Sequence, residues 1–181
     1  MRLKLLSPDE MTEDQRQTYD ESIASKRGKP PPPMLAWLNS PEMARHATRL
    51  GAVLRFDTVF PAKLSEIAIL VTARHWTAHY EWYAHKKLAL DAGLDPAIID
   101  AIRDRRTPGF DDPKAAMIYD VARSLHEGHG LTPALYEAAI TLLGERGLVE
   151  IIGLCGYYTM VSMTLNTFEF ELPAGEVSEL A

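Results

Sequence analysis

Proline repeatedly follows a polar residue that can cap a helix, and this pattern most limits the folds open to the chain. Proline suits the first position of a helix, because its fixed φ is helical and its missing N–H would lack a partner there anyway. Four such pairs directly precede a helical pattern: Ser40-Pro41, Asp95-Pro96, Asp112-Pro113 and Thr132-Pro133. The sequence has no stretch of alternating apolar and polar residues, bounded by turn residues, that would predict a β-strand. The sequence therefore predicts an all-α fold.

The N-terminal region is expected to stand apart from the rest of the chain. Thr12-Glu13-Asp14-Gln15 has the form of a capping box and predicts a helix to about Ser25. Residues 26–33 (KRGKPPPP) predict an extended break, because consecutive prolines cannot continue a helix. We expect residues 1–33 to be an N-terminal helix with a proline-rich linker, and residues 34–181 to be one helical domain. The helices expected in that domain cover 41–56, 62–92, 96–104, 113–127, 133–143 and 148–167.

Composition argues against several classes of protein. The net charge of −6 leaves no basic surface for nucleic acid. Residues 148–168 are mostly apolar, but Glu150, Asn166 and two glycines interrupt them, so a buried helix is expected rather than a membrane span. The single cysteine, Cys155, excludes an intramolecular disulfide and favours a reducing compartment. A cytoplasmic protein without nucleic-acid or membrane partners is the expectation.

Residues 74–85 (RHWTAHYEWYAH) place many ionisable side chains in a segment that otherwise resembles core. Buried charge is costly unless each group is paired or used. On one continuous helix, at about 100° per residue, Glu66, Arg74, Glu81 and His85 share one stripe. Glu81 and His85 are four positions apart and can touch across one turn. A carboxylate orients an imidazole and raises its basicity, so this pair suits general acid–base catalysis.

Each residue of the predicted site receives a role from its chemistry. His85 is the expected proton donor or acceptor and Glu81 its partner, while Arg74 contacts a substrate carboxylate. Glu66 is expected to contact these catalytic residues without touching the substrate. Two histidines on a neighbouring stripe, His75 and His79, are alternate catalytic candidates. Tyr80 and Trp82 are expected to form walls of the substrate pocket.

Ordinary interpretations of these residues remain open. A glutamate and a histidine four apart commonly pair on an exposed helix, and Arg74 could pair with Glu66 or Asp91. Tryptophan and tyrosine at helical spacing are usually part of the core.

The other histidines predict no metal site. His75 and His79 have the spacing of half a metal site, but no third ligand is placed near them. His126 and His129 flank a glycine turn and are expected to be solvated.

Several segments together resemble the carboxymuconolactone decarboxylase family over about residues 34–170. The segments are 39–42 (NSPE), 64–70 (LSEIAIL), 73–76 (ARHW), 80–85 (YEWYAH), 92–94 (AGL), 150–153 (EIIG) and 165–166 (LN). The resemblance implies a helical bundle of the alkylhydroperoxidase D-like type that assembles as a homo-oligomer, a trimer or hexamer. It also implies decarboxylation of a small carboxylated lactone in aromatic breakdown, without a cofactor.

Relatives of the alkylhydroperoxidase D type instead reduce peroxides with a Cys-x-x-Cys pair. Their pattern falls on Glu66, Ala78, Glu81 and His85, so the glutamate and histidine match while both cysteines are absent. Without a thiolate there is no nucleophile for a peroxide.

The expected function is therefore a cofactor-free acid–base enzyme acting on a small carboxylated lactone or oxo-acid. An isomerase or hydrolase would use the same groups. A non-catalytic homo-oligomer that binds a small ligand is the alternative from another class, and peroxide reduction is disfavoured.

Overall fold

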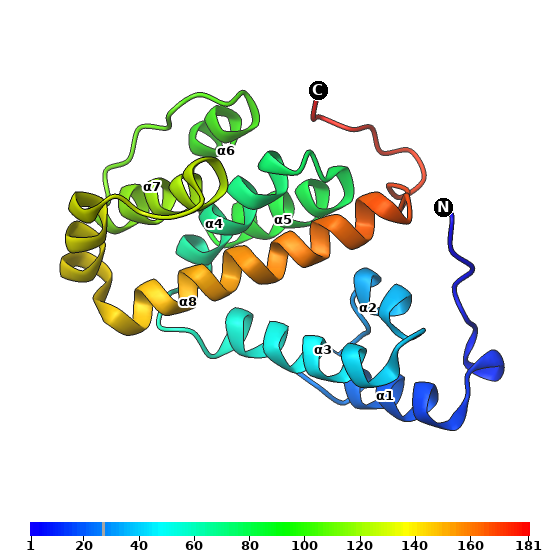
Figure 1. Ribbon diagram of the computed structural model, residues 1–181. Helices are drawn as coiled ribbons and strands as arrows, with labels where there is room; N and C mark the ends of the chain where they lie inside the picture. The colour runs from blue at the N-terminus through cyan, green and yellow to red at the C-terminus, as the bar shows by residue number, and fades with distance from the viewer. Residues whose placement is uncertain (27) are drawn as a thin grey trace.

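The computed structural model describes residues 1–26 and 28–181, and this part of the chain is helical without strands, which confirms the all-α prediction (Figure 1). The elements are η1 (Pro8–Glu10), α1 (Glu13–Ile23), α2 (Pro32–Trp37), α3 (Pro41–Phe56), α4 (Ala62–His75), α5 (His79–Asp91), α6 (Pro96–Arg103), α7 (Pro113–Gly128) and α8 (Pro133–Thr167).

All four helices predicted to begin at a proline do so, and three of the four preceding residues form a side-chain cap, whereas Ser40 does not. Asp95 accepts a hydrogen bond from the backbone N–H of Ala97 at 2.8 Å, and Asp112 accepts one from Lys114 at 2.8 Å. The capping box at the start of α1 is also formed, since Thr12 and Gln15 each bind the other's backbone N–H. These contacts satisfy N–H groups that a helix start otherwise leaves free.

The proline-rich break is shorter than predicted. Pro31 is extended, with φ −70° and ψ 147°, but α2 begins at Pro32 inside the proline run. Prolines are tolerated here because the first turn of a helix needs no backbone donor. Arg27, within the predicted break, lies outside the described residues.

The expected single helix over 62–92 is wrong. The chain forms α4 and α5 instead, joined by a turn in which Thr77 has a φ of 46°. Arg74 Nη1 donates to Thr77 Oγ1 at 3.3 Å and steadies this turn. Helix α5 then packs back against α4. No glycine or proline marks the turn, so the sequence pattern reads as continuous.

Helix α8 joins the two helices predicted over 133–143 and 148–167. Gly144 interrupts it with φ 72° and ψ 168°, so the predicted break shrinks to one residue. By length and composition alone α8 is able to cross a membrane, and half of its most apolar stretch is buried inside the protein.

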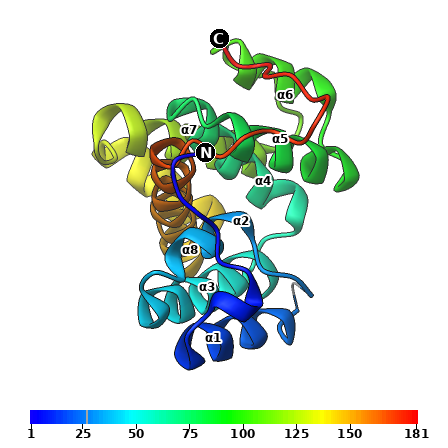
Figure 2. The same ribbon diagram turned by 90° about the vertical axis from the view of Figure 1, so that its right-hand side faces the viewer.

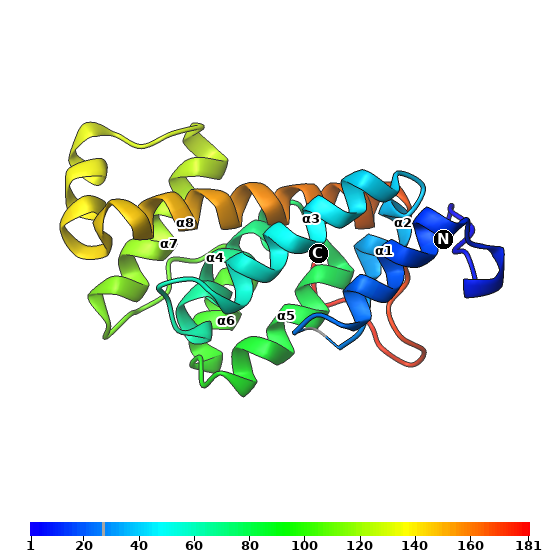
Figure 3. The same cartoon turned by 90° about the horizontal axis from the view of Figure 1, so that it is seen from below.

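Two groups of helices lie on opposite sides of α8. Helices α4 to α7 cover one side, whereas α1, α2 and α3 cover the other (Figures 1, 2 and 3). Helix α4 is central, since it contacts α5, α7 and α8. Its Ile67 and Leu70 are fully buried, and Ile151 and Leu165 of α8 are nearly so. The core that holds the candidate site is therefore built around α4 and α8.

We predict that Gly144→Ala destabilises the protein by about 1–3 kcal/mol, because its combination of φ and ψ is open almost only to glycine. An added Cβ meets no atom within 4 Å, so backbone strain alone accounts for the loss. Urea unfolding measures it.

Gly156→Ala is the matched control on the same helix. Gly156 also has open space but no positive φ, so alanine should leave the stability unchanged or raise it by up to about 1 kcal/mol. Equal effects of the two substitutions would contradict the strained conformation at Gly144.

Candidate functional site

A buried histidine lies between two carboxylates where α5 folds back on α4. His85 Nδ1 is 2.6 Å from Glu66 Oε2, and His85 Nε2 is 3.0 Å from Glu81 Oε1. The three residues are each 4–5% exposed. On a continuous helix Glu66 and His85 would be about 28 Å apart along the axis. The turn between α4 and α5 therefore creates this Glu66–His85–Glu81 triad.

The two carboxylates determine the charge of His85. Burial disfavours the imidazolium, but the charges of Glu66 and Glu81 and their hydrogen bonds outweigh it and raise the pKa of His85 to about 9. At neutral pH both ring N–H groups consequently donate, one to each carboxylate. The triad then holds one positive and two negative charges.

Two tyrosines of α8 cover the triad. The ring of Tyr158 meets the ring of His85 edge-on, with 4.9 Å between centroids, and Tyr157 packs against Tyr158 at 5.3 Å. Burial raises the pKa of Tyr158 well above its ordinary value, while Arg55 opposes this effect. The Tyr158 hydroxyl is therefore a neutral hydrogen-bond donor beside the triad.

Glu81 and His85 line a cavity of about 760 Å³. This volume is within the range of small-molecule sites. Its wall combines four cations with one further carboxylate, aromatic rings, prolines and small or aliphatic side chains: Lys26, Lys29, Arg55, Lys87, Asp91, Phe56, Tyr80, Tyr157, Tyr158, Pro30 to Pro33, Ala84, Leu88 and Val161. The cationic part of this wall suits a small anion carrying an apolar or conjugated body.

The structure brings together three of the four predicted catalytic residues. Glu66, Glu81 and His85 form the triad, in which Glu66 contacts His85 directly. Tyr80 lines the cavity, as expected for a pocket wall. Trp82 does not: it is 2% exposed, and its indole N–H donates to Glu179 Oε2 at 3.5 Å.

Arg74 lies away from the triad, so the predicted shared stripe is wrong for this residue. Its Nε donates to the backbone oxygen of Arg103 at 2.6 Å, and its Nη2 to that of Ala181 at 3.2 Å. The stripe assumed one helix over 62–92, and the turn at Thr77 removes that geometry.

The two alternate histidines are also elsewhere. His75 stacks on His126, with 4.7 Å between ring centroids, and His79 is exposed with its Nδ1 beside Ser178 Oγ at 2.5 Å. His126, expected to be solvated, is half-buried and bound to Thr72 Oγ1 at 2.8 Å. His129 is exposed as expected.

Several cavity residues escaped prediction from the sequence. A sequence signal for Tyr157 and Tyr158 does exist, because two adjacent tyrosines place two hydroxyl groups in an otherwise apolar helix. Both side chains are buried in the structure. Arg55 and Lys87 carry no local signal, because an isolated cation on a helix is ordinarily solvated. Only the cavity that Arg55 of α3 and Lys87 of α5 line together identifies them.

We predict that the free energy of unfolding falls as the pH rises from about 6.5 to 9. The raised pKa of His85 means that the imidazolium stabilises the folded state fully below pH 6.5, and this contribution is lost as His85 deprotonates near pH 9. The loss is on the order of 3 kcal/mol. Urea unfolding at several pH values measures it.

His85→Gln should lower the stability at pH 7 and abolish the pH dependence in this interval. The control is His46→Gln. His46 Nε2 lies 3.0 Å from Glu42 Oε1, and the two residues are four positions apart, as Glu81 and His85 are, but exposed. Such surface pairs contribute little to the free energy of unfolding. A wild-type protein equally stable at pH 6.5 and pH 9 would refute a charged His85.

The comparisons with known proteins identify the fold. No protein-family model and no curated protein matches the sequence. The structure is similar to a crystal structure described as an alkylhydroperoxidase AhpD core, an uncharacterized peroxidase-related protein from Ralstonia eutropha JMP134. The TM-score is 0.78 at 17% identity, covering 96% of this chain and 92% of that one. The chain therefore has the alkylhydroperoxidase D-like helical fold.

Proposed function

We propose that the protein is a cofactor-free acid–base enzyme that decarboxylates a small carboxylated lactone or oxo-acid. The observation that carries this proposal is the buried His85, held between Glu66 and Glu81 at the wall of a cavity with a cationic rim. A group with a pKa of about 9 is protonated at neutral pH and is available as a general acid.

The chemistry needs a place for charge and a source of one proton. Loss of CO2 breaks a carbon–carbon bond and leaves its electron pair on the substrate, delocalised into the conjugated carbonyl as an enolate. The proton shared by His85 Nε2 and Glu81 then moves to the carbon atom, while Glu66 keeps the second ring N–H in place. Proton uptake from solvent restores the imidazolium.

Cations on the cavity wall would bind the substrate carboxylate, which is the role that the sequence predicted for Arg74. Arg55 lies at the end of α3, and Lys87 lies two residues after His85 on α5. A substrate whose carboxylate is bound by such groups would have its reacting carbon within the same cavity as Glu81 and His85. The Tyr158 hydroxyl, held neutral by burial, can donate to the enolate oxygen.

We predict that His85→Gln and Glu81→Gln each lower kcat by about 10²- to 10⁴-fold, the usual contribution of a general acid. Loss of absorbance from a panel of conjugated carboxylated lactones, with release of CO2, measures turnover. Glu42→Gln and His46→Gln, at the exposed pair of equal spacing on α3, should leave kcat unchanged.

The same experiment separates the enzyme from a non-catalytic, ligand-binding homo-oligomer. Circular dichroism first shows that the variants are folded. If wild-type protein binds such lactones but consumes none, the binding protein replaces the enzyme. If kcat survives both triad substitutions, the triad has only a structural role.

Peroxide reduction is the second candidate, because the similar crystal structure is described as peroxidase-related. Burial raises the pKa of Cys155, the single thiol, to about 12, so it is not a thiolate at neutral pH. It is 3% exposed and lies on α8.

We predict that wild-type protein and Cys155→Ser reduce peroxide at the same background rate in a thiol-dependent assay. Serine is nearly isosteric with cysteine, so folding should be kept. A wild-type rate above background that Cys155→Ser removes would establish thiol chemistry and overturn the acid–base proposal.

A further inference from the structure

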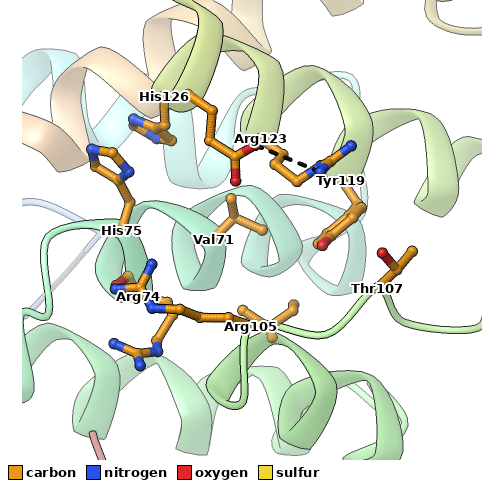
Figure 4. A pocket seen from close by; sticks show the side chains of 10 residues that line it. Val71, Arg74, His75, Arg105, Thr107, Tyr119, Arg123 and His126 are labelled. Atoms are coloured by element: carbon orange, nitrogen blue, oxygen red, sulfur yellow. Dashed lines mark hydrogen bonds and ion pairs between the residues drawn. The ribbon is translucent and has the colours of Figure 1, made fainter. Parts of the chain in front are cut away.

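A second cavity, lined by three arginines among other residues, lies between α4, α7 and the segment that joins α6 to α7 (Figure 4). Its volume is about 140 Å³, and it has no lining residue in common with the cavity at the triad. We call it the arginine cleft. Its lining residues are Val71, Arg74, His75, Ile102, Arg105, Thr107, Tyr119, Arg123, His126 and Glu127.

Carboxylates balance only part of the positive charge in the arginine cleft, since Arg123 alone of its three arginines pairs with a carboxylate, that of Glu127. Among the described residues, no aspartate or glutamate side chain forms an ion pair with Arg74 or Arg105. Asp104 is close, but it is bound by Arg103 at 2.9 Å and by Arg106 at 3.2 Å. Arg74 is only 8% exposed, and burial together with the charge of Arg105 lowers its pKa.

The two histidines of the cleft respond to this positive field. Burial and then Arg105 lower the pKa of His75, and burial and then His75 lower the pKa of His126 to about 4. Thr72 Oγ1 contacts His126 Nε2 at 2.8 Å and fixes that ring under His75. Both imidazoles are therefore neutral at pH 7. Because Thr72 Oγ1 donates to the backbone oxygen of Ala68, the single N–H of His126 donates to Thr72, and only the N–H of His75 can donate to an anion.

One carboxylate does reach the cleft. Glu127 contacts Arg123 at 3.5 Å, and both side chains are at least half exposed. Figure 4 shows the two histidines at one side of the cleft and the Tyr119 and Thr107 hydroxyls at the other. A long, exposed ion pair is weak, so Glu127 can be displaced by a better ligand.

We propose that the arginine cleft binds a phosphate-sized oxyanion, either as the free ion or as the phosphate group of a small ester. Guanidinium groups recognise such oxyanions by paired, charge-assisted hydrogen bonds. Arg105 and Arg123 approach from different segments and would supply these contacts. Arg74 contributes mainly its buried charge, because each of its three nitrogens already donates one hydrogen bond, to Arg103, Thr77 and Ala181.

Titration with inorganic phosphate, followed by the NMR resonances of His75 and His126, tests this site on the whole protein at pH 7. Wild-type protein should show saturable shifts of both histidines. Arg105→Gln should weaken binding by about 10- to 100-fold, as expected for loss of hydrogen bonds to a charged group. Glu127→Gln should tighten binding, because it removes the competing carboxylate.

Arg49→Gln is the control, since Arg49 is an exposed arginine of α3 paired with Glu21, and phosphate binding should not change. Glycerol 3-phosphate distinguishes the two sources of the anion: tighter binding than inorganic phosphate indicates an ester, and weaker binding indicates the free ion.

Two results would overturn the proposal. One is the absence of saturable histidine shifts in wild-type protein. The other is an affinity that neither Arg105→Gln nor Arg123→Gln alters while both variants are folded by circular dichroism.

Discussion

The buried ion triad of Glu66, His85 and Glu81 is the interaction on which the rest of this structure depends. Removing each charge from water costs several kcal/mol, and only well-placed hydrogen bonds between opposite charges offset this cost. Each partner fixes part of the fold: Glu66 comes from α4, and His85 and Glu81 come from α5. The α4–α5 hairpin and the charge of the imidazolium therefore stabilise each other.

The triad also explains the character of the cavity beside it. One imidazolium and two carboxylates leave a net negative charge in the core. The positive charges of Arg55 and Lys87 in the cavity wall offset this charge. An anionic substrate would complete this arrangement by lying on the cations with its reacting carbon at the triad. Helix α4 carries Arg74 in its last turn, where the helix dipole favours positive charge.

Local signals in the sequence predicted much of the secondary structure. Asp95 and Asp112 cap their helices where a following proline indicated, and Thr12 with Gln15 forms the expected box. The turn at Thr77 was missed because a threonine with positive φ has no sequence signature comparable to glycine. That single residue separates the predicted stripe into two sites, one around His85 and one around Arg74.

The sequence by itself determined the all-α class, the helix starts and the Glu81–His85 pair, because capping, periodicity and i,i+4 contacts are local properties. Tertiary structure alone decided that Glu66 reaches His85, that Arg55 and Tyr158 share their cavity, and that Arg74 joins Arg105 instead. These contacts join residues 19 or more positions apart, so they depend on how α4, α5 and α8 pack. Packing is a property of the whole core, and no single segment contains it.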